Sequence, residues 1–230
     1  MRPFQGNVAL AQDFDSLSPS KYFVHLAALN RCDDEYKILD TNVLGTYNVA
    51  RHCLKNRIKL LVAGSTKHYG MYAASKRVSE TILTALLPCG LVGAYLRLPN
   101  VFGPHCRPYY NSFVSTILHH ISIDEPYEHL IHDPFAEIRL LHVSDLCKAI
   151  DTLLTGCLHD FAERHGSESP FSIDFWNAGE FRITIGDFCR IAEGDEPINS
   201  PYACQRTKHL IQNTLDWYKN NAKSNKTHRR

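Results

Sequence analysis

Short apolar runs alternate with helix-like patterns along the first half of the chain, and this alternation restricts the fold more than any other feature. The runs over 22–28, 58–64 and 91–98 read as strands. Between them, 38–56 and 72–87 show the apolar spacing of amphipathic helices. Strands that alternate with helices of this length form parallel sheets with crossover helices. The sequence therefore predicts an α/β protein with a doubly wound parallel sheet.

A further short strand is possible near the N-terminus, over 7–10. The second half of the chain has a less regular order of elements than the first. The predicted elements there are a helix to about Ile121, a strand over 138–143, a helix over 145–154 capped by Ser144, a loop over 159–170, a strand over 171–178, a helix from the cap Thr184 to Ala192, and a helix over 205–220. The basic residues 221–230 are predicted to be a disordered tail.

Composition excludes several classes of protein. The 230 residues carry a net charge of +1, which gives no case for nucleic-acid binding. No apolar run approaches the ~18 residues that span a bilayer, and no signal-peptide core is present, so we expect a cytoplasmic protein without membrane contact. The eight cysteines are scattered and predicted to be reduced. The thirteen histidines lack ligand spacing, so no metal site is expected.

Chemistry-bearing residues gather just after the predicted strand over 58–64. Ser65 would lie at the carboxyl end of that strand, where open α/β sheets bind ligands. Tyr72 and Lys76 share one helix face. The ammonium should lower the phenol's pKa from its usual ~10, so that Tyr72 can exchange a proton with a substrate alcohol or carbonyl while Ser65 holds the oxygen. The alternative is an ordinary pair of exposed helix residues.

Small residues mark two places where another group could approach the backbone closely. Ala27 and Ala28 end a predicted strand and admit either a flat group or phosphate near the backbone, or only a tight turn. Gly45 interrupts a predicted helix together with Asn42, which indicates close packing against a neighbouring segment.

Together these motifs resemble the extended short-chain dehydrogenase/reductase superfamily, the NAD(P)-dependent nucleotide-sugar epimerases, dehydratases and reductases. The resemblance runs from about Asp13 to Tyr218 and implies a Rossmann-like fold. The segments that carry it, in chain order, are His-Leu-Ala-Ala at 25–28, Asn-Val-Leu-Gly-Thr at 42–46, Ser65 with Tyr69-Gly70, Tyr72-x-x-x-Lys76, Leu-Arg-Leu-Pro-Asn-Val-Phe-Gly-Pro at 96–104 and His-Val-Ser-Asp at 142–145.

A narrower resemblance rests on residues 25–31 and 97–112. These segments are similar to the reductase domain of capsular-polysaccharide ketosugar reductases, which make a UDP-N-acetyl-6-deoxy-talosamine precursor of N-acetylfucosamine. In that family a zinc-binding cupin domain follows the reductase domain, and we expect no such domain in these 230 residues. The resemblance implies a UDP-sugar substrate, NADP or NAD as cofactor, and a homodimer formed through the helices over 38–56 and 72–87.

The resemblance also implies roles for individual residues. The catalytic residues would be Ser65, Tyr72 and Lys76. The cofactor would be bound by Asp13 and Phe14 at its adenine, by Ala27 and Ala28 along its length, by Lys76 at the nicotinamide ribose, and by Leu98. The substrate would be bound by Asn100, Arg107 and Asn111. For Arg107, a surface ion pair is the alternative to gripping a diphosphate.

Two departures from the superfamily bear on the reaction. Its 4,6-dehydratases follow their serine or threonine with Asp-Glu, whereas this chain has Thr66-Lys67-His68. We therefore expect a reductase first and an epimerase second, with Cys106 either an extra acid or base or only a packing residue. The Gly-x-x-Gly-x-x-Gly loop that holds the cofactor pyrophosphate is missing.

The missing loop predicts an N-terminally incomplete sheet that lacks the first strand, the loop and the second strand. Val24's strand would then have no inner neighbour and would expose an apolar edge. Either the start is truncated, or another segment or subunit supplies the missing part, or the protein is a non-catalytic remnant of the family. The expected organisation is a partial cofactor domain over 1–105, a mixed segment over 106–220 that completes the sheet and forms the substrate lobe, and the tail.

Overall fold

The computed structural model divides into two compact units. The first unit comprises Met1–Leu98 and Ala149–Phe175, and the second comprises Pro99–Lys148 and Trp176–Arg230. The structure describes residues 3–15, 17, 20–110, 112–156, 171–175, 179–198 and 204–225. The division falls at Leu98, earlier than the expected boundary after residue 105, and a later segment returns to the first unit.

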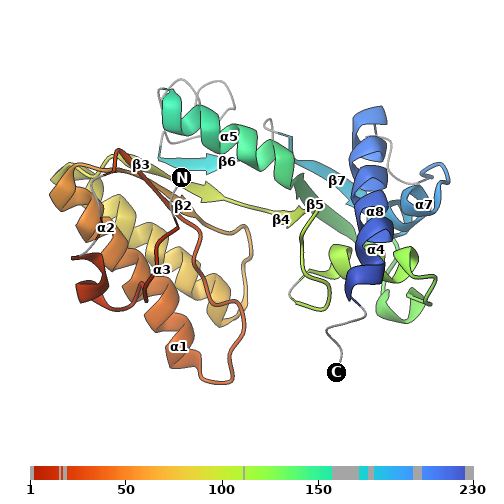
Figure 1. Ribbon diagram of the computed structural model, residues 1–230, viewed down its shortest axis with the longest axis horizontal. Helices are drawn as coiled ribbons and strands as arrows, with labels where there is room; N and C mark the ends of the chain where they lie inside the picture. Colours follow the sequence, from red (N-terminus) through yellow and green to blue (C-terminus); the bar gives the residue numbers. More distant parts are fainter. Residues whose placement is uncertain are drawn as a thin grey trace. The chain divides into compact units, whose positions relative to one another are not determined.

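The first unit contains a four-stranded parallel sheet (Figure 1). Its strands are β1 (Tyr22–His25), β2 (Lys59–Ala63), β3 (Gly93–Arg97) and β6 (Ser172–Asp174), in the order β1-β2-β3-β6. In the register of the pairs, His25 lies beside Val62 and Ala63 lies beside Leu96. The carboxyl ends of these three strands therefore share one edge of the sheet. The predicted α/β class with a parallel sheet is confirmed.

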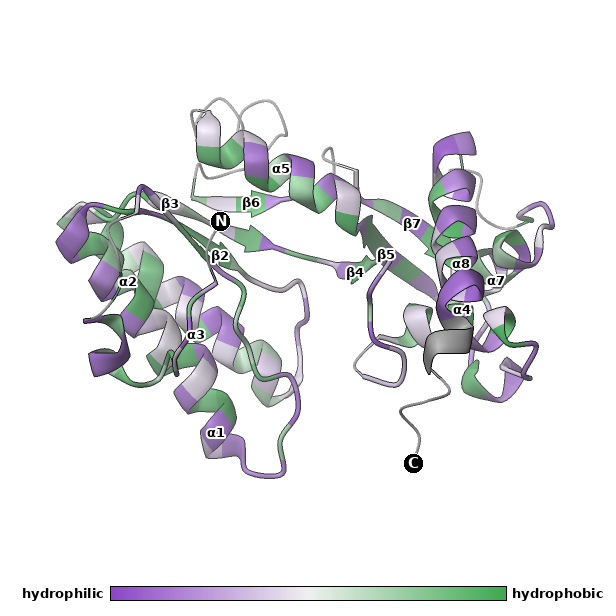
Figure 2. Ribbon diagram, viewed as in Figure 1, coloured by the Kyte–Doolittle hydropathy of each residue, from purple (hydrophilic) through white to green (hydrophobic). Residues whose placement is uncertain are grey.

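The helices that follow β1 and β2 lie on one side of this sheet (Figure 1). They are α1 (Glu35–Leu39), α2 (Gly45–Asn56) and α3 (Gly70–Leu86); a turn of π-helix, η2 (Asp40–Leu44), joins the first two. A short η3 (Leu87–Cys89) follows α3. The predicted helix over 38–56 is thus confirmed but begins at Glu35. Hydrophobic residues dominate the strands that these helices cover (Figure 2).

Gly45 is where the N-terminal segment meets α2. A Cβ atom at this position would lie 2.6 Å from Cγ2 of Val8, which is closer than side-chain carbons approach. The side-chain amide of Asn48 donates to the carbonyl oxygens of Val8 and Ala9, both at 3.1 Å. The close packing predicted from Gly45 is confirmed.

The prediction of a possible short strand over 7–10 is wrong, because these residues form a turn. The side-chain oxygen of Asn7 accepts a hydrogen bond from the Ala9 amide at 3.0 Å, as in an Asx turn. The Asp13 carboxylate accepts from the Asn7 amide at 2.7 Å, and a 3-10 helix, η1 (Ala11–Phe14), follows. These local bonds compete with strand pairing.

Strand β1 lies at an edge of the sheet, as predicted for Val24's strand. Among the described residues, β2 is the strand with which it pairs. Tyr22 is 42% exposed and Val24 is half-buried, so apolar side chains are accessible along this edge. The outward backbone groups of such a strand can pair with a further strand.

The second unit contains a three-stranded mixed sheet. Its strands are β4 (Asn100–Phe102), β5 (Glu137–His142) and β7 (Phe181–Thr184), with β4 parallel and β7 antiparallel to β5. Its helical segments are α4 (Phe113–Ser122), η4 (Glu128–Leu130), α7 (Ile185–Glu193) and α8 (Gln205–Asn225). Thr184 caps α7 by accepting from the Asp187 amide at 3.2 Å, as predicted.

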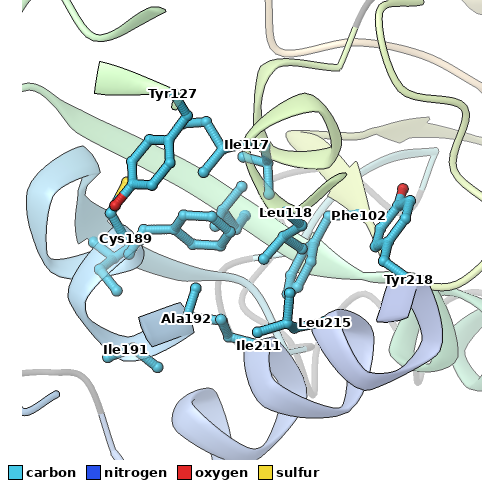
Figure 3. Packing of buried hydrophobic residues seen from close by; sticks show 14 residues of the cluster. Phe102, Ile117, Leu118, Tyr127, Cys189, Ile191, Ala192, Ile211, Leu215 and Tyr218 are labelled. Atoms are coloured by element: carbon cyan, nitrogen blue, oxygen red, sulfur yellow. The ribbon is translucent and has the colours of Figure 1, made fainter. Parts of the chain in front are cut away.

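A hydrophobic cluster fills the second unit (Figure 3). Phe102, Leu118 and Leu215 lie together in it, from β4, α4 and α8. The ring of Phe102 is 1% exposed and packs edge-on against the rings of Phe181 and Phe188. Burial of this many large side chains explains why β4, α4 and α8 pack together although they are far apart in the sequence.

Helix α8 continues to Asn225, so the prediction of disorder from residue 221 is wrong for 221–225. The segment contains no Gly or Pro that would end the helix, and the Asn221 side chain donates to the Trp217 carbonyl at 2.8 Å. Residues 226–230, the predicted loop over 159–170, and the end of the strand predicted over 171–178 lie outside the described residues.

Helix α5 (Val143–Thr155) begins in the second unit and ends in the first. Ser144 does not cap it, because the helix already begins at Val143. Instead the ring Nδ1 of His142 accepts from the Ser144 amide at 3.2 Å. At the other end, Nζ of Lys59 donates to the carbonyl oxygens of Leu153 and Gly156 at 2.6 and 3.0 Å, which satisfies carbonyls that a helix end leaves free. No helix within the described ranges has the length and apolar character needed to cross a membrane.

Candidate functional site

The loop between β2 and α3 extends the strand pairing beyond the sheet. The amide of Gly64 donates to the Leu96 carbonyl at 2.8 Å, and the Thr66 amide donates to the Leu98 carbonyl at 3.0 Å. A Cβ atom on Gly64 would lie 2.2 Å from a ring carbon of Tyr95, so glycine is required here. These contacts fix Ser65 at the carboxyl edge of the sheet, as predicted.

Lys76 lies on α3 and reaches back to the end of β2. Its ammonium donates to the Ala63 carbonyl at 2.7 Å and lies 5.9 Å from the centre of the Tyr72 ring. The residue is 3% exposed, and burial lowers the pKa of Lys76 to about 8. The Tyr95 hydroxyl donates to the Lys76 carbonyl at 2.7 Å and holds this turn of α3 against β3.

The pKa of the Tyr72 phenol is raised, because burial disfavours the phenolate, while a hydrogen bond with the Ser65 hydroxyl acts in the opposite direction. The sequence-based prediction that Lys76 lowers this pKa is therefore wrong in direction. The ammonium of Lys76 is engaged by the Ala63 carbonyl, and burial is the largest influence on the pKa of the phenol. Ser65 and Tyr72 do come together, which is the pairing that the motif indicates.

Asn42, in the π-helical turn, connects the loop after β1 to α3. It is fully buried, and its side chain accepts from the Leu29 amide at 2.7 Å and donates to the Leu29 carbonyl at 3.0 Å and to the Ser75 hydroxyl at 2.9 Å. Ser75 in turn donates to the Tyr72 carbonyl at 2.7 Å. From the sequence, Asn42 was expected to interrupt a helix and belongs to one of the segments that carry the resemblance, but these hydrogen bonds were not predicted. A polar amide on the apolar stripe of a predicted helix could have indicated a buried hydrogen-bonding residue. The π-helical turn itself is a feature that often occurs at functional sites.

His25 is buried beneath the same edge. The Thr46 hydroxyl donates its one proton to the Asn42 carbonyl at 2.6 Å, so the 3.1 Å contact between His25 Nε2 and Thr46 Oγ1 places the ring proton on Nε2. Burial, and secondarily the Lys76 ammonium, lower the pKa of His25 to about 4. The imidazole is therefore neutral at neutral pH.

The predicted cofactor residues all belong to the first unit. Ala27 is exposed and Ala28 half-buried in the loop after β1, and Leu98 is half-buried beside Thr66. The Asp13 carboxylate is engaged by the Asn7 amide. Phe14 is 5% exposed, with its ring stacked on that of Phe4 at 4.9 Å, so its side chain belongs to the core.

The predicted substrate residues belong to the second unit. Asn100 is exposed on β4 and its side-chain amide donates to the Arg139 carbonyl at 3.3 Å. Arg107 is exposed, with its guanidinium 5.5 Å from the centre of the Tyr110 ring. Within the described part of the chain, no carboxylate forms an ion pair with Arg107. Asn111 lies outside the described residues.

The loop that carries Arg107 is held in a strained conformation. Tyr109 has a positive φ of 60°, in the left-handed region that non-glycine residues rarely adopt. Its amide donates to the Thr116 hydroxyl at 2.9 Å, and its phenol oxygen lies 3.1 Å from Nε2 of His120. The Tyr218 hydroxyl donates to the carbonyl of Cys106. Backbone strain that the surroundings enforce is characteristic of functional sites.

Within the described ranges, no three His, Cys, Asp or Glu side chains come together as metal ligands would.

Comparison with known proteins shows which families and structures this chain resembles. Residues 70–161 match the profile of the NAD dependent epimerase/dehydratase family. A reductase of Pseudomonas aeruginosa, UDP-2-acetamido-2,6-beta-L-arabino-hexul-4-ose reductase, is 34% identical over 144 residues, which are 60% of this chain and 38% of that protein. The resemblance to nucleotide-sugar epimerases and reductases is confirmed.

Solved structures share the fold. The UDP-N-acetylglucosamine 4-epimerase of Methanobrevibacter ruminantium M1 superposes with a TM-score of 0.72 at 17% identity, covering 93% of this chain and 81% of that one. RMD of Pseudomonas aeruginosa, solved with NADPH, superposes with a TM-score of 0.69 at 16% identity, covering 94% of this chain and 89% of that one. The chain therefore has the predicted Rossmann-like fold, and its alignment to the curated reductase spans little more than a third of that protein's length.

Proposed function

We propose that the protein is an NAD(P)-dependent reductase of a UDP-4-keto-6-deoxy-hexose in cell-surface polysaccharide synthesis. The observation that carries this proposal is the gathering of Ser65, Tyr72 and Lys76 at the carboxyl edge of the sheet. The related reductase of Pseudomonas aeruginosa supports the substrate class, since its name describes a UDP-linked ketosugar.

The residues around Lys76 fit a nicotinamide cofactor. An ammonium has three N–H donors, and the Ala63 carbonyl is the hydrogen-bond partner of Lys76 within the described residues. The remaining donors suit a ribose hydroxyl, and the exposed Ala27 offers backbone unobstructed by a long side chain. When bound, the cofactor supplies the hydride. We assign Asp13, Phe14, Ala28 and Leu98 to the same site, with Phe14 contributing through its backbone because its ring is in the core.

Three side chains then have distinct roles. Tyr72 gives its phenolic proton to the carbonyl oxygen of the sugar, which becomes a hydroxyl. Ser65 holds that oxygen by hydrogen bonding, and Lys76 holds the cofactor ribose. The raised pKa of Tyr72 keeps the phenol protonated at neutral pH, as a proton donor must be.

Asn100, Arg107 and Asn111 are proposed to bind the nucleotide sugar. Arg107 is suited to a diphosphate, because a guanidinium can donate two parallel hydrogen bonds and no described carboxylate competes for it. The strained, well-anchored loop would present Arg107 in a fixed conformation.

The first test is NADPH oxidation with a UDP-4-keto-6-deoxy sugar. Tyr72→Phe should reduce turnover by ~10²–10⁴-fold, because the proton donor is removed while the ring still packs. Tyr69→Phe is the matched control, since Tyr69 is 91% exposed at the start of the same helix. Equal rates for Tyr72→Phe and the unaltered chain would refute the assigned role.

Cofactor binding should be measured separately, by the thermal shift of the purified chain with NADPH and NADH. A ligand that binds only the folded state stabilises it by ~2.7 kcal/mol at a hundredfold excess over its Kd. No shift with either cofactor would favour a non-catalytic member of the family. Product analysis by NMR distinguishes a reductase from an epimerase, because an epimerase changes stereochemistry without net NADPH consumption.

We also propose a homodimer formed through η2, α2 and α3. Leu44, Tyr47 and Val78 are 43%, 38% and 45% exposed on these segments. Light scattering should give twice the monomer mass, and Val78→Glu should shift the protein toward the monomer because a buried carboxylate without a partner is costly. An unchanged mass for Val78→Glu would contradict this interface.

A further inference from the structure

A second cation lies beside Tyr72, supplied by the loop rather than by the helix. Nζ of Lys67 is 5.7 Å from the centre of the Tyr72 ring, and Nζ of Lys76 is 5.9 Å from it. The backbone of Lys67 is fixed by the site itself, because its amide donates to the Ser65 hydroxyl at 3.2 Å. Lys67 is thus tied to the same serine that contacts the Tyr72 phenol.

The two lysines differ in what else engages them. The ammonium of Lys76 is buried and donates to the Ala63 carbonyl. Lys67 is exposed, and among the described residues no carboxylate lies within ion-pair distance of it. Its charge is therefore not neutralised by a neighbour, and its flexible stem lets it move toward negative charge that develops on Tyr72.

We propose that Lys67 is a positioning residue whose ammonium stabilises the phenolate that Tyr72 becomes when it gives its proton to the substrate. This inference rests on the proposed function and adds a residue outside the Ser65, Tyr72 and Lys76 set. The proton passes from the phenol to the sugar oxygen, and solvent later returns one to the phenolate. The negative charge appears in a half-buried ring, where a nearby cation stabilises it.

The expected size of the effect follows from Coulomb's law. A unit charge about 6 Å from the centre of the ring, screened as in water because Lys67 is exposed, shifts the pKa of the phenol by ~0.5 unit. The other groups that face Tyr72 are the Ser65 hydroxyl from the loop, Lys76 from α3 and Tyr95 from β3. None of these changes when Lys67 is replaced.

The decisive measurement is a pH titration of Tyr72 by NMR of the protein labelled at the tyrosine ζ-carbons, with the signal assigned by its loss in Tyr72→Phe. Lys67→Arg and Lys67→Gln are compared, because arginine stays charged throughout the titration and glutamine carries no charge. Tyr72 in Lys67→Gln should titrate ~0.5 unit higher than in Lys67→Arg. The difference should shrink in about 1 M salt, which screens exposed charges. Lys37→Gln, which removes an exposed lysine from α1, is the control and should leave the titration unchanged.

Kinetics provide the second measurement. Lys67→Gln should lower kcat by at most about threefold, the ratio that ~0.5 pKa unit represents, and Lys67→Arg should restore it. The limb of the pH–rate profile at high pH should move with the NMR titration. Equal titration of Tyr72 in Lys67→Arg and Lys67→Gln overturns the proposal, as does a change confined to KM, which would place Lys67 on the ligand. The titration needs no turnover, so a chain that shows the shift but oxidises no NADPH supports the electrostatic role of Lys67 and refutes the proposed reaction alone.

Discussion

The interiors of the two units are organised by different interactions. Beneath the carboxyl edge of the first unit's sheet, His25, Thr46, Asn42 and Ser75 form a connected chain of hydrogen bonds that reaches the backbone of Tyr72. The second unit is organised around a cluster of large apolar side chains, in which aromatic rings meet edge-on. The first interior is held by directional hydrogen bonds, whereas the second is held by apolar packing, which depends mainly on side-chain volume and shape.

The difference explains where the reactive groups lie. A buried hydrogen bond fixes distances and angles, so a polar network can hold a serine, a tyrosine and a lysine at one edge of a sheet. Apolar packing contributes more free energy per residue but does not orient a proton donor. The first unit is thus suited to place chemical groups, and the second is suited to anchor a loop such as the one that carries Arg107, for which we propose a binding role.

The largest effect on stability is expected in the apolar cluster. Phe102→Ala should lower the free energy of unfolding by ~3–5 kcal/mol, because a ring that is 1% exposed is replaced by a cavity. Phe135→Ala is the matched control in the same unit. Phe135 is 69% exposed, so its replacement should change the free energy of unfolding little. Chemical denaturation measures both. Similar losses for the two variants would show that this cluster does not dominate the second unit.

An intermediate effect is expected from pH acting on the polar network. The pKa of His25 is lowered from 6.5 to about 4 in the folded chain, so between these values the unfolded chain binds more protons. This residue's contribution is fully present above pH 6.5 and is lost as the pH falls toward 4, by about 3 kcal/mol at the most.

The measurement is the free energy of unfolding against pH for the unaltered chain and for His25→Gln. The variant should lose less stability between pH 6.5 and 4. Parallel curves for the two proteins would contradict a neutral, buried imidazole at this position.

The smallest stability effect is expected at Asn42, with a disproportionate effect on activity. Asn42→Ala leaves the Leu29 amide and carbonyl without their partner, which should cost ~1–3 kcal/mol. It also frees the loop after β1 from α3, so turnover should fall more than stability alone explains. Asn56→Ala, at the exposed end of α2, is the control. Unchanged kcat in a folded Asn42→Ala protein would show that this hydrogen-bond network is not needed to position the catalytic groups.

The alternation of apolar runs and helical patterns predicted the parallel sheet, because side-chain periodicity is a local property of the backbone. It also located Ser65, Tyr72 and Lys76, since the residue order places a serine at a strand end and a Tyr-x-x-x-Lys pair on the following helix. Gly45 indicated a close contact, although not that Val8 makes it. Ser144 and the segment over 7–10 were misjudged, because the competing partners, His142 and Asp13, became apparent only in three dimensions.

The sequence by itself determined the element types, the strand edge that carries the serine, and the family resemblance, since these depend on spacing and residue chemistry along the chain. Only the tertiary structure decided the protonation preferences and the partners of the site. Burial raised the pKa of Tyr72 against the sequence-based expectation, Asn42 joined Leu29 to Ser75, and Lys67 came to lie beside the Tyr72 ring. Solvent exclusion and contacts between distant segments set these properties, and neither is encoded in any short stretch of sequence.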